Sequence, residues 1–257
     1  MMPLLQVDSM THYFGGLRAV YDFDLEIEKG EMRGLIGPNG AGKSTIFNLI
    51  TGMYKPTEGQ IRFKNVDLVG RRPYDIAGLG IGRTFQNLRL WRHITVLDHV
   101  RLARYAKINY RLVDAFFGTG RWRRGEQEIT DKAYSFLEMM GIERFADEIV
   151  TNLPYGVQRK VELARAMAVE PELLLLDEPT AGMNPEEMVE MMAVIREIHD
   201  EFGPAIYLIE HRMRVVMDLC DYIQTLNFGE VIAEGTPDEI RGNPAVIEAY
   251  LGEEEED

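Results

Sequence analysis

The alternation of apolar and polar side chains predicts several strands in the first quarter of the chain. Residues 23–28 alternate strictly between apolar and acidic side chains, a period of two that is typical of a half-buried strand. The mostly apolar segment 32–36 predicts a short buried strand, and alternation over 60–64 predicts another after turn-forming residues at 56–59. We therefore expect antiparallel strands in the early part of the chain.

The second half contains a continuous apolar run at 173–176, directly followed by Asp177 and Glu178. Such a run is typical of a central parallel strand that is covered on both faces. Apolar residues then recur at helical spacing from Met188 to Phe202, and a further apolar run occupies 205–209. This strand–helix–strand order predicts a right-handed crossover in a parallel sheet.

Between these two regions the pattern is mostly helical. It runs from about His99 to Met140, is interrupted by glycines at 118–120, and precedes a second motif that begins at Leu153. We interpret this stretch as a helical subdomain.

A glycine-rich segment follows the strand predicted at 32–36. Gly37, Gly42, Lys43 and Ser44 have the spacing of a phosphate-binding loop, whose backbone N–H groups cradle phosphates. In such a loop the lysine reaches the β- and γ-phosphates and the hydroxyl binds Mg²⁺. A helix predicted over 46–50 follows, so its dipole adds to the attraction for a triphosphate.

Asp177 and Glu178 follow the apolar run at 173–176. Asp177 is placed to organise Mg²⁺, and Glu178 is placed to orient or deprotonate a water molecule. With the phosphate loop in the same chain, this pair predicts a nucleotide-hydrolysis site. The patterns together predict an α/β fold with a phosphate-loop core of mainly parallel sheet, an antiparallel β portion and a helical subdomain.

Composition excludes several other classes of function. The 257 residues carry 28 Lys and Arg against 42 Asp and Glu, a formal charge of −14, which argues against a nucleic-acid-binding surface. Five of these negative charges form an acidic tail at 253–257, which we expect to be a solvated end. The single cysteine, Cys220, excludes an internal disulfide, and the five histidines lack the pairing of a metal centre.

No stretch of the sequence approaches the 18 consecutive apolar residues that a membrane helix needs. The first eleven residues have neither a basic region nor an apolar region long enough for a signal peptide. We therefore expect a soluble, cytoplasmic chain.

Several motifs occur in the order found in ATP-binding subunits of ABC transporters, and the resemblance covers nearly the whole chain. These motifs are Gly37 to Thr45, Gly82-Arg83-Thr84-Phe85-Gln86, Leu153 to Gln158, Leu173 to Glu178, and His211. Looser runs resemble the subunits of branched-chain amino acid importers: Phe14 to Val20, Asp177 to Pro185, Leu208 to His211, and Gly242 to Gly252.

The resemblance implies one ATP-binding domain over 1–257. Within it, 1–98 and 159–252 would form the phosphate-loop core with its antiparallel β portion, and 99–158 would form the helical subdomain. The implied function is ATP hydrolysis that powers an ABC importer for branched-chain amino acids, with ATP and Mg²⁺ as cofactors. The implied location is the cytoplasmic face of the membrane, as a peripheral subunit.

Carried over residue by residue, the resemblance implies specific roles. Glu178 would be the base, His211 would hold the water and Glu178 in place, and Gln86 would contact Mg²⁺ and the attacking water. Phe14 would stack on adenine, although Tyr13 competes for this role and a core phenylalanine is an alternative. The nucleotide would be bound by Phe14, Gly37, Asn39, Gly40, Ala41, Gly42, Lys43, Ser44 and Thr45, and Mg²⁺ by Ser44, Gln86 and Asp177.

ABC subunits work as face-to-face dimers in which a signature segment, usually Leu-Ser-Gly-Gly-Gln, caps the ATP of the partner. Here the segment contains Pro154, Tyr155, Gly156 and Val157, so proline replaces serine and valine replaces glutamine. Pro154 is acceptable at a first helical position, but it lacks the N–H that an anion site uses. We expect an asymmetric heterodimer with a second ATP-binding subunit; tolerated drift at both positions is the alternative.

The implied partners are transmembrane permease subunits and, indirectly, a solute-binding protein, with no nucleic acid. Between Arg101 and Arg124 seven basic residues face one acid, which suits a contact with membrane subunits or anionic lipid heads, or else a solvated helical face. Two alternative functions stay open: an ABC ATPase for another solute such as urea or a lipid, and a soluble ABC ATPase outside transport.

Overall fold

The computed structural model describes residues 2–107 and 110–251. Within these ranges the chain forms two compact units, each described by itself. Unit 1 contains residues 2–83, 172–178 and 195–251, and unit 2 contains 84–107, 110–171 and 179–194. The predicted helical subdomain, 99–158, falls in unit 2. The acidic tail predicted at 253–257 lies outside the described residues.

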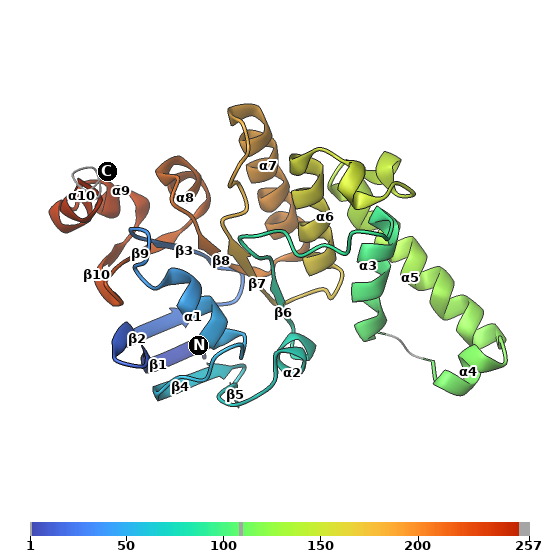
Figure 1. The fold of residues 1–257 in the computed structure, drawn as a ribbon, viewed down its shortest axis with the longest axis horizontal. Coiled ribbons are helices and arrows are strands. Elements are labelled where there is room, and N and C mark those ends of the chain that lie inside the picture. Colours follow the sequence, from blue (N-terminus) through green and yellow to red (C-terminus); the bar gives the residue numbers. More distant parts are fainter. Residues whose placement is uncertain (1, 108–109, 252–257) are drawn as a thin grey trace. The chain divides into compact units, whose positions relative to one another are not determined.

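The described part of unit 1 contains a six-stranded, mainly parallel sheet (Figure 1). Five strands are parallel, and the edge strand β10 pairs antiparallel with β9. Strands predicted at 32–36, 173–176 and 205–209 are confirmed, as is the parallel crossover. The strand order is β10 (Glu230–Gly235), β9 (Tyr222–Asn227), β3 (Met32–Ile36), β8 (Ala205–Ile209), β7 (Leu173–Asp177) and β6 (Ile81–Arg83).

A second, antiparallel sheet of unit 1 has the order β2 (Leu17–Ile27), β1 (Leu5–Phe14), β4 (Glu58–Phe63) and β5 (Val66–Asp67). The alternation at 23–28 lies at the end of β2, and that at 60–64 lies in β4. One expectation needs correction: the strand before the glycine-rich segment, β3, pairs with β8 and β9 and so belongs to the parallel sheet.

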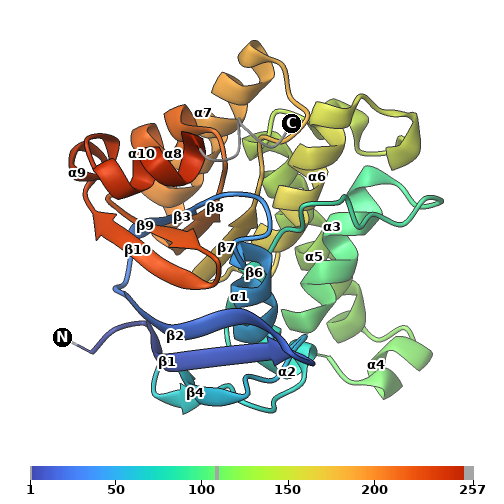
Figure 2. The same cartoon turned by 60° about the vertical axis from the view of Figure 1, so that its left-hand side comes forward.

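The helix α1 (Lys43–Ile50) joins the two sheets of unit 1 into one core (Figure 2). Phe47 of α1 is fully buried, and its ring centroid lies 5.3 Å from that of Tyr207 on β8. Phe23 and Phe63 reach the same cluster from the antiparallel sheet. Each such ring contributes roughly 1.5–3 kcal/mol when it leaves water. Burial of these rings therefore holds α1, and with it the loop that precedes it, against both sheets.

The opposite face of the parallel sheet carries α8 (Met213–Leu219), as Figures 1 and 2 show. A Cβ atom at Gly34 on β3 would lie 2.7 Å from Val216 of α8, so only glycine permits this approach. Two short helices end the described chain, α9 (Pro237–Arg241) and α10 (Pro244–Leu251), while α2 (Pro73–Gly78) precedes β6.

Unit 2 is helical among its described residues. The long helix α5 (Gly120–Met139) buries Ile129, Ala133, Phe136 and Leu137, one stripe at helical spacing. This stripe packs near α3 (Val96–Arg104) and α6 (Tyr155–Met167), which confirms the helical pattern predicted over 99–140. The short helix α4 (Leu112–Phe116) precedes α5. Helix α7 (Pro185–Phe202) begins in unit 2 and ends in unit 1.

Candidate functional site

The loop between β3 and α1 has a backbone that only glycine permits at two positions. Gly37 has φ 146°, and a Cβ atom there would lie 2.0 Å from the carbonyl oxygen of Leu226. Gly42 has φ 108°, and its Cβ would lie 2.4 Å from the carbonyl oxygen of Ala19. Gly40, with φ 77°, faces open space. The loop is thus a preformed backbone cradle with room in front of Gly40.

Lys43 is buried, and its ammonium lies over this cradle. Its Nζ atom donates hydrogen bonds to the carbonyl oxygens of Gly37 at 2.6 Å and Pro38 at 2.8 Å. The first turn of α1 contains no acidic residue, so the helix dipole at this end stays favourable to an anion. Ser44 is exposed and Thr45 half-buried, while Asn39 is exposed and Ala41 is buried. A cation, a helix start and a glycine cradle together fit a triphosphate.

The described C-terminal residues form a wall beside the phosphate loop. Residues 38–41 line a pocket of about 710 Å³ together with Phe228 and with Ala245, Glu248 and Ala249 of α10. In addition, the N–H of Gly37 donates a 2.8 Å hydrogen bond to the Oη atom of Tyr250, also on α10. Helix α10 therefore contacts the loop directly, which the sequence did not reveal.

Asp177 ends β7 and is buried with 2% of its surface exposed. Its Oδ2 atom lies 3.3 Å from Nη2 of Arg83, the last residue of β6, and both side chains are buried. The Nη1 atom of Arg83 also donates a 2.7 Å hydrogen bond to Oγ1 of Thr51, just beyond α1. Arg83 thus holds the acid from the next strand, a role that its place in the sequence motif did not indicate.

Glu178 follows Asp177 in a left-handed conformation, with φ 48°. Its N–H donates a 2.9 Å hydrogen bond to the carbonyl oxygen of Ile209 at the end of β8. A non-glycine residue in this region is strained, and such strain is often found at functional sites. The carboxylate atom Oε2 lies 3.7 Å from Nδ1 of His211, whose side chain is half exposed. The fold thus brings the predicted base and its predicted orienting group together.

Glu210, between Ile209 and His211, is fully buried. Its Oε2 atom accepts hydrogen bonds from the backbone N–H groups of His211 at 3.2 Å and Arg212 at 3.4 Å. This carboxylate closes the turn that presents His211. The sequence did not reveal this role of Glu210, because nothing in the neighbouring residues indicates that its carboxylate binds backbone N–H groups.

Phe14 ends β1 and is 42% exposed, so it is not a core phenylalanine. Its ring lies edge-on to His12, with centroids 4.6 Å apart, and edge-on to Tyr54 at 5.3 Å. Tyr13 is also exposed, at 38%. The exposed ring of Phe14 thus lies in a group of aromatic side chains in unit 1, and Tyr54 is a member that the sequence did not single out.

Gln86 lies in unit 2, next to the start of α6. Its carbonyl oxygen and that of Phe85 accept hydrogen bonds from the guanidinium of Arg159, the latter at 2.8 Å. Arg159 in turn pairs with Glu162 at 3.2 Å, and both side chains are buried. Burial raises the pKa of the Glu162 carboxyl above its usual range. This buried pair fixes the segment that carries Gln86 onto α6.

The signature segment forms the beginning of α6. Pro154 is the N-cap of α6, with ψ 151°, and the helix begins at Tyr155. The proline thus lies one position before the first helical position at which we expected it. Tyr155, Gly156 and Val157 form the first turn, and Pro154 and Tyr155 are exposed. The Tyr155 Oη atom accepts a 2.9 Å hydrogen bond from Nε of Arg159. The helix therefore forms without the serine that the signature usually has.

No group of three or more His, Cys, Asp and Glu side chains in the described ranges is arranged to hold a metal ion. Of the residues predicted to bind Mg²⁺, Ser44 and Asp177 lie in unit 1 and Gln86 lies in unit 2. Hydroxyl, amide and carboxylate oxygens are ligands of the kind that Mg²⁺ takes. None of the described helices is long and apolar enough to cross a membrane.

Comparison with known proteins agrees with this geometry. The sequence model of the family described as "ABC transporter" matches residues 20–181, and that of the "Branched-chain amino acid ATP-binding cassette transporter" matches 230–256. The high-affinity branched-chain amino acid transport ATP-binding protein LivG of Salmonella typhimurium is 45% identical over 251 residues, 98% of each chain.

Solved structures are similar as well. The ADP conformation of MJ1267, an ATP-binding cassette of an ABC transporter, has a TM-score of 0.84 and 30% identity, covering 98% of this chain and 100% of that one. The dimeric ATP-binding cassette MJ0796 bound to ADP and Pi has a TM-score of 0.77 and 27% identity, covering 91% and 98%. The predicted fold class is confirmed, and the chain belongs to the ABC transporter family as one of its ATP-hydrolysing, ATP-binding cassettes.

Proposed function

We propose that this chain is the ATPase subunit that powers an importer of branched-chain amino acids, bound peripherally at the cytoplasmic face of the membrane to permease subunits. The observation that carries the enzymatic part is the convergence of Lys43, Asp177, Glu178 and His211 at the carboxyl ends of neighbouring strands in unit 1. The solute class rests on the name of the relative LivG and on the C-terminal family match.

In this proposal the phosphates of ATP lie in the glycine cradle. Backbone N–H groups of residues 39–45 and the Lys43 ammonium bind the phosphate oxygens, and the aromatic ring of Phe14 stacks on adenine. By the resemblance, Ser44, Asp177 and Gln86 would hold Mg²⁺, and the ion would supply positive charge to the phosphates. The buried guanidinium of Arg83, 3.3 Å from Oδ2 of Asp177, holds this carboxylate in position.

Glu178 acts as the base that takes a proton from the attacking water. Its strained backbone and its bond to Ile209 hold the carboxylate at the strand end, where His211 faces it. His211 orients the water and Glu178, and the buried carboxylate of Glu210 fixes the turn that carries His211. Hydrolysis of the β–γ bond then permits the closed state to reopen, which would switch the permease between two states.

Closure requires a second ATP-binding subunit. The cassette MJ0796 is dimeric with ADP and Pi bound, and its fold is similar to this one. We infer that the partner is a different chain with an intact signature, because Pro154 and Val157 remove two donors from the segment that caps the partner's ATP. Each lost bond to a charged group is worth about 1.5–3 kcal/mol, so the site that this chain caps would be the weaker one.

The solute is tested in proteoliposomes that contain this chain, its companion ATPase and its permease. We expect the solute-binding protein loaded with leucine, isoleucine or valine to stimulate ATP hydrolysis severalfold, and urea to have no effect. Glu178→Gln should remove the stimulation, and Glu186→Gln, at an exposed glutamate of α7, should retain it. Stimulation by urea alone would assign the chain to another solute, and no stimulation by any loaded solute-binding protein would contradict a role in import.

A further inference from the structure

The short helix α4 presents an unusual apolar surface. Leu112 is 89% exposed and Phe116 is 84% exposed, and Val113 and Phe117 are exposed as well. The rings of Phe116 and Phe117 lie edge-to-face, with centroids 5.2 Å apart. Leu112, Val113 and Phe116 lie at i, i+1 and i+4, on one side of the helix. We call residues 111–117 the α4 tip. Four large apolar side chains so close together normally mark an interaction surface.

The tip has a defined structure. Asp114 accepts a 3.0 Å hydrogen bond from the backbone N–H of Arg111 and a 3.1 Å bond from Oγ1 of Thr119, the N-cap of α5. The bond from Arg111 is the main cause that lowers the pKa of Asp114. The one acid between Arg101 and Arg124 is therefore occupied within the turn from α4 to α5. Figures 1 and 2 both show α4 next to the start of α5.

The residues that flank the tip are basic. Lys107, Arg121, Arg123 and Arg124 are exposed, and none of them forms an ion pair with a carboxylate in the part of the chain that the structure describes. Arg104 differs, because it pairs with Glu170 at 3.2 Å. These cations are therefore available to an external anion.

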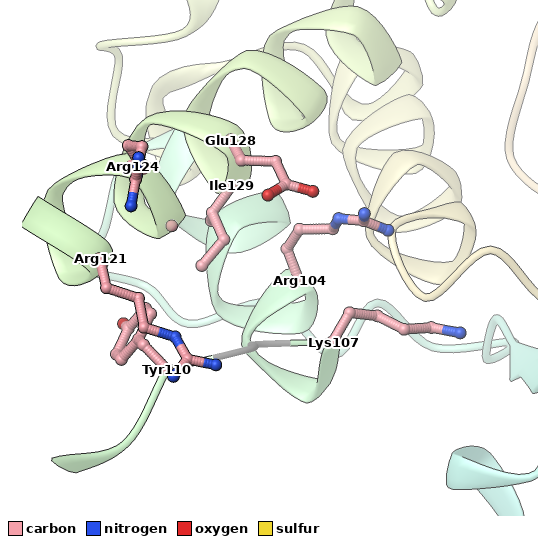
Figure 3. A pocket seen from close by; sticks show the side chains of 8 residues that line it. Arg104, Lys107, Tyr110, Arg121, Arg124, Glu128 and Ile129 are labelled. Atoms are coloured by element: carbon pink, nitrogen blue, oxygen red, sulfur yellow. The ribbon is translucent and has the colours of Figure 1, made fainter. Parts of the chain in front are cut away.

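Three of these cations border one cavity. Lys107, Arg121 and Arg124, with Tyr110, line a pocket of about 270 Å³, and Figure 3 shows these side chains. The remaining lining residues are Arg104, Gly125, Glu128 and Ile129. Glu126, at the base of the same segment, accepts hydrogen bonds from Tyr105 and Tyr110 and pairs with Arg101 at 3.1 Å. Its charge is thus compensated internally. Glu128 adds one carboxylate to the pocket against three exposed cations, so the rim beside the apolar tip is basic.

We propose that the α4 tip and its basic rim bind an anionic phospholipid surface directly. The apolar side chains would enter the boundary between headgroups and acyl chains, and the rim would bind headgroup phosphates. Local charge favours this occupant: the segment from Arg101 to Arg124 carries +6 in a chain of −14, so this segment, unlike the chain as a whole, is attracted to an anionic bilayer. This contact is additional to the proposed permease contact and does not depend on the transported solute.

The test is flotation of the purified full chain with vesicles of phosphatidylcholine alone or with about 30% phosphatidylglycerol, which gives the vesicles a negative surface potential. We expect binding to the anionic vesicles only. Each basic residue near such a surface strengthens binding about fivefold, so Arg121→Gln, Arg123→Gln and Arg124→Gln together should weaken it on the order of 100-fold. Phe116→Ser with Phe117→Ser should weaken it at least about tenfold.

The matched control is Arg144→Gln, Arg214→Gln and Arg241→Gln, three exposed arginines outside the tip and rim that give the same change of charge. This variant should bind vesicles like the wild type, and all variants should bind Mg·ATP normally. Insertion is tested with Phe116→Trp, whose emission brominated phospholipids should quench. Equal loss in both triple variants would overturn the proposal. The proposal would also be overturned if the wild type bound no vesicles but bound the permease in detergent, and if this binding required the α4 tip. The surface would then recognise protein instead of lipid.

Discussion

The Oη atom of Tyr250 on α10 accepts a 2.8 Å hydrogen bond from the backbone N–H of Gly37, the first glycine of the phosphate loop. The two residues are 213 positions apart in the chain. Tyr250 lies within the C-terminal segment, 230–256, that matches the branched-chain amino acid family model. The end of the chain therefore positions the loop that receives the nucleotide.

Replacing this tyrosine should change nucleotide affinity. Tyr250→Phe leaves the Gly37 N–H without its acceptor, a loss worth about 1 kcal/mol, so we expect the Kd for Mg·ATP to rise about fivefold. Isothermal titration measures it. Tyr134→Phe, on α5 in unit 2, is the matched control and should leave the Kd unchanged. An unchanged Kd in Tyr250→Phe would show that α10 does not position the loop.

Arg83 is expected to be a stability determinant of unit 1. Arg83→Met leaves the buried carboxylate of Asp177 without its guanidinium partner, which should cost about 3 kcal/mol in the free energy of unfolding. Urea denaturation followed by circular dichroism measures this loss. Arg72→Met removes an exposed pair with Asp75 and should cost less than about 0.5 kcal/mol. If the two variants were equally stable, Arg83 would not hold Asp177.

Stability should fall in mild acid because of His99. This side chain is fully buried, its Nδ1 atom bonds the carbonyl of Thr95 at 2.8 Å, and its Nε2 atom accepts from the N–H of Trp91 at 2.9 Å. Burial is the main cause that lowers its pKa below the ordinary value of 6.5, with nearby Arg165 adding to the effect and Asp98 opposing it.

The neutral form therefore belongs to the folded state. As the pH falls through 6.5, His99 becomes protonated in the unfolded chain but stays neutral in the folded chain. The contribution of His99 to the free energy of unfolding is therefore fully present above pH 6.5 and is lost as the pH falls below it. We expect the free energy of unfolding of His99→Gln to change less than that of the wild type between pH 7.5 and about 5.5. His93→Gln is the control, and a pH dependence identical in both variants would rule His99 out.

The signature can be repaired by substitution. Pro154→Ser and Val157→Gln restore the two donors, and we expect them to raise the ATP affinity of the site that this chain caps on its companion by at least tenfold. The measurement is ATP binding to the mixture of both ATPases, with Glu186→Gln, at an exposed glutamate outside the signature, as the control. No gain in affinity would support tolerated drift instead of asymmetry.

Local patterns predicted the elements that depend on local causes. The spacing of Gly37, Gly42 and Lys43 predicted a loop whose glycines indeed have positive φ angles, and alternation predicted the end of β2. Strand β1 escaped prediction, because Ser9 has φ 45° and the register shifts between Val7 and Met10 interrupt its alternation.

The missed residues share one property: their partners are distant in sequence or are backbone atoms. Tyr250 reaches Gly37, and Arg83 reaches Asp177, only after the chain has folded. Glu210 faces N–H groups of the turn that follows it, which no residue pattern distinguishes from solvent exposure. The site residues that the resemblance implied lie in two units, with Gln86 and the signature in unit 2 and the others in unit 1. Their roles stay predictions until they are tested by substitution.

The most direct test of the central claim is Mg·ATP turnover by the wild type, Glu178→Gln and the control Glu186→Gln, each with the companion ATPase. We expect all three chains to bind ATP, the wild type and the control to hydrolyse it, and Glu178→Gln to lose at least about 100-fold in rate, the contribution of a positioned base. Hydrolysis by Glu178→Gln at the wild-type rate would contradict the account.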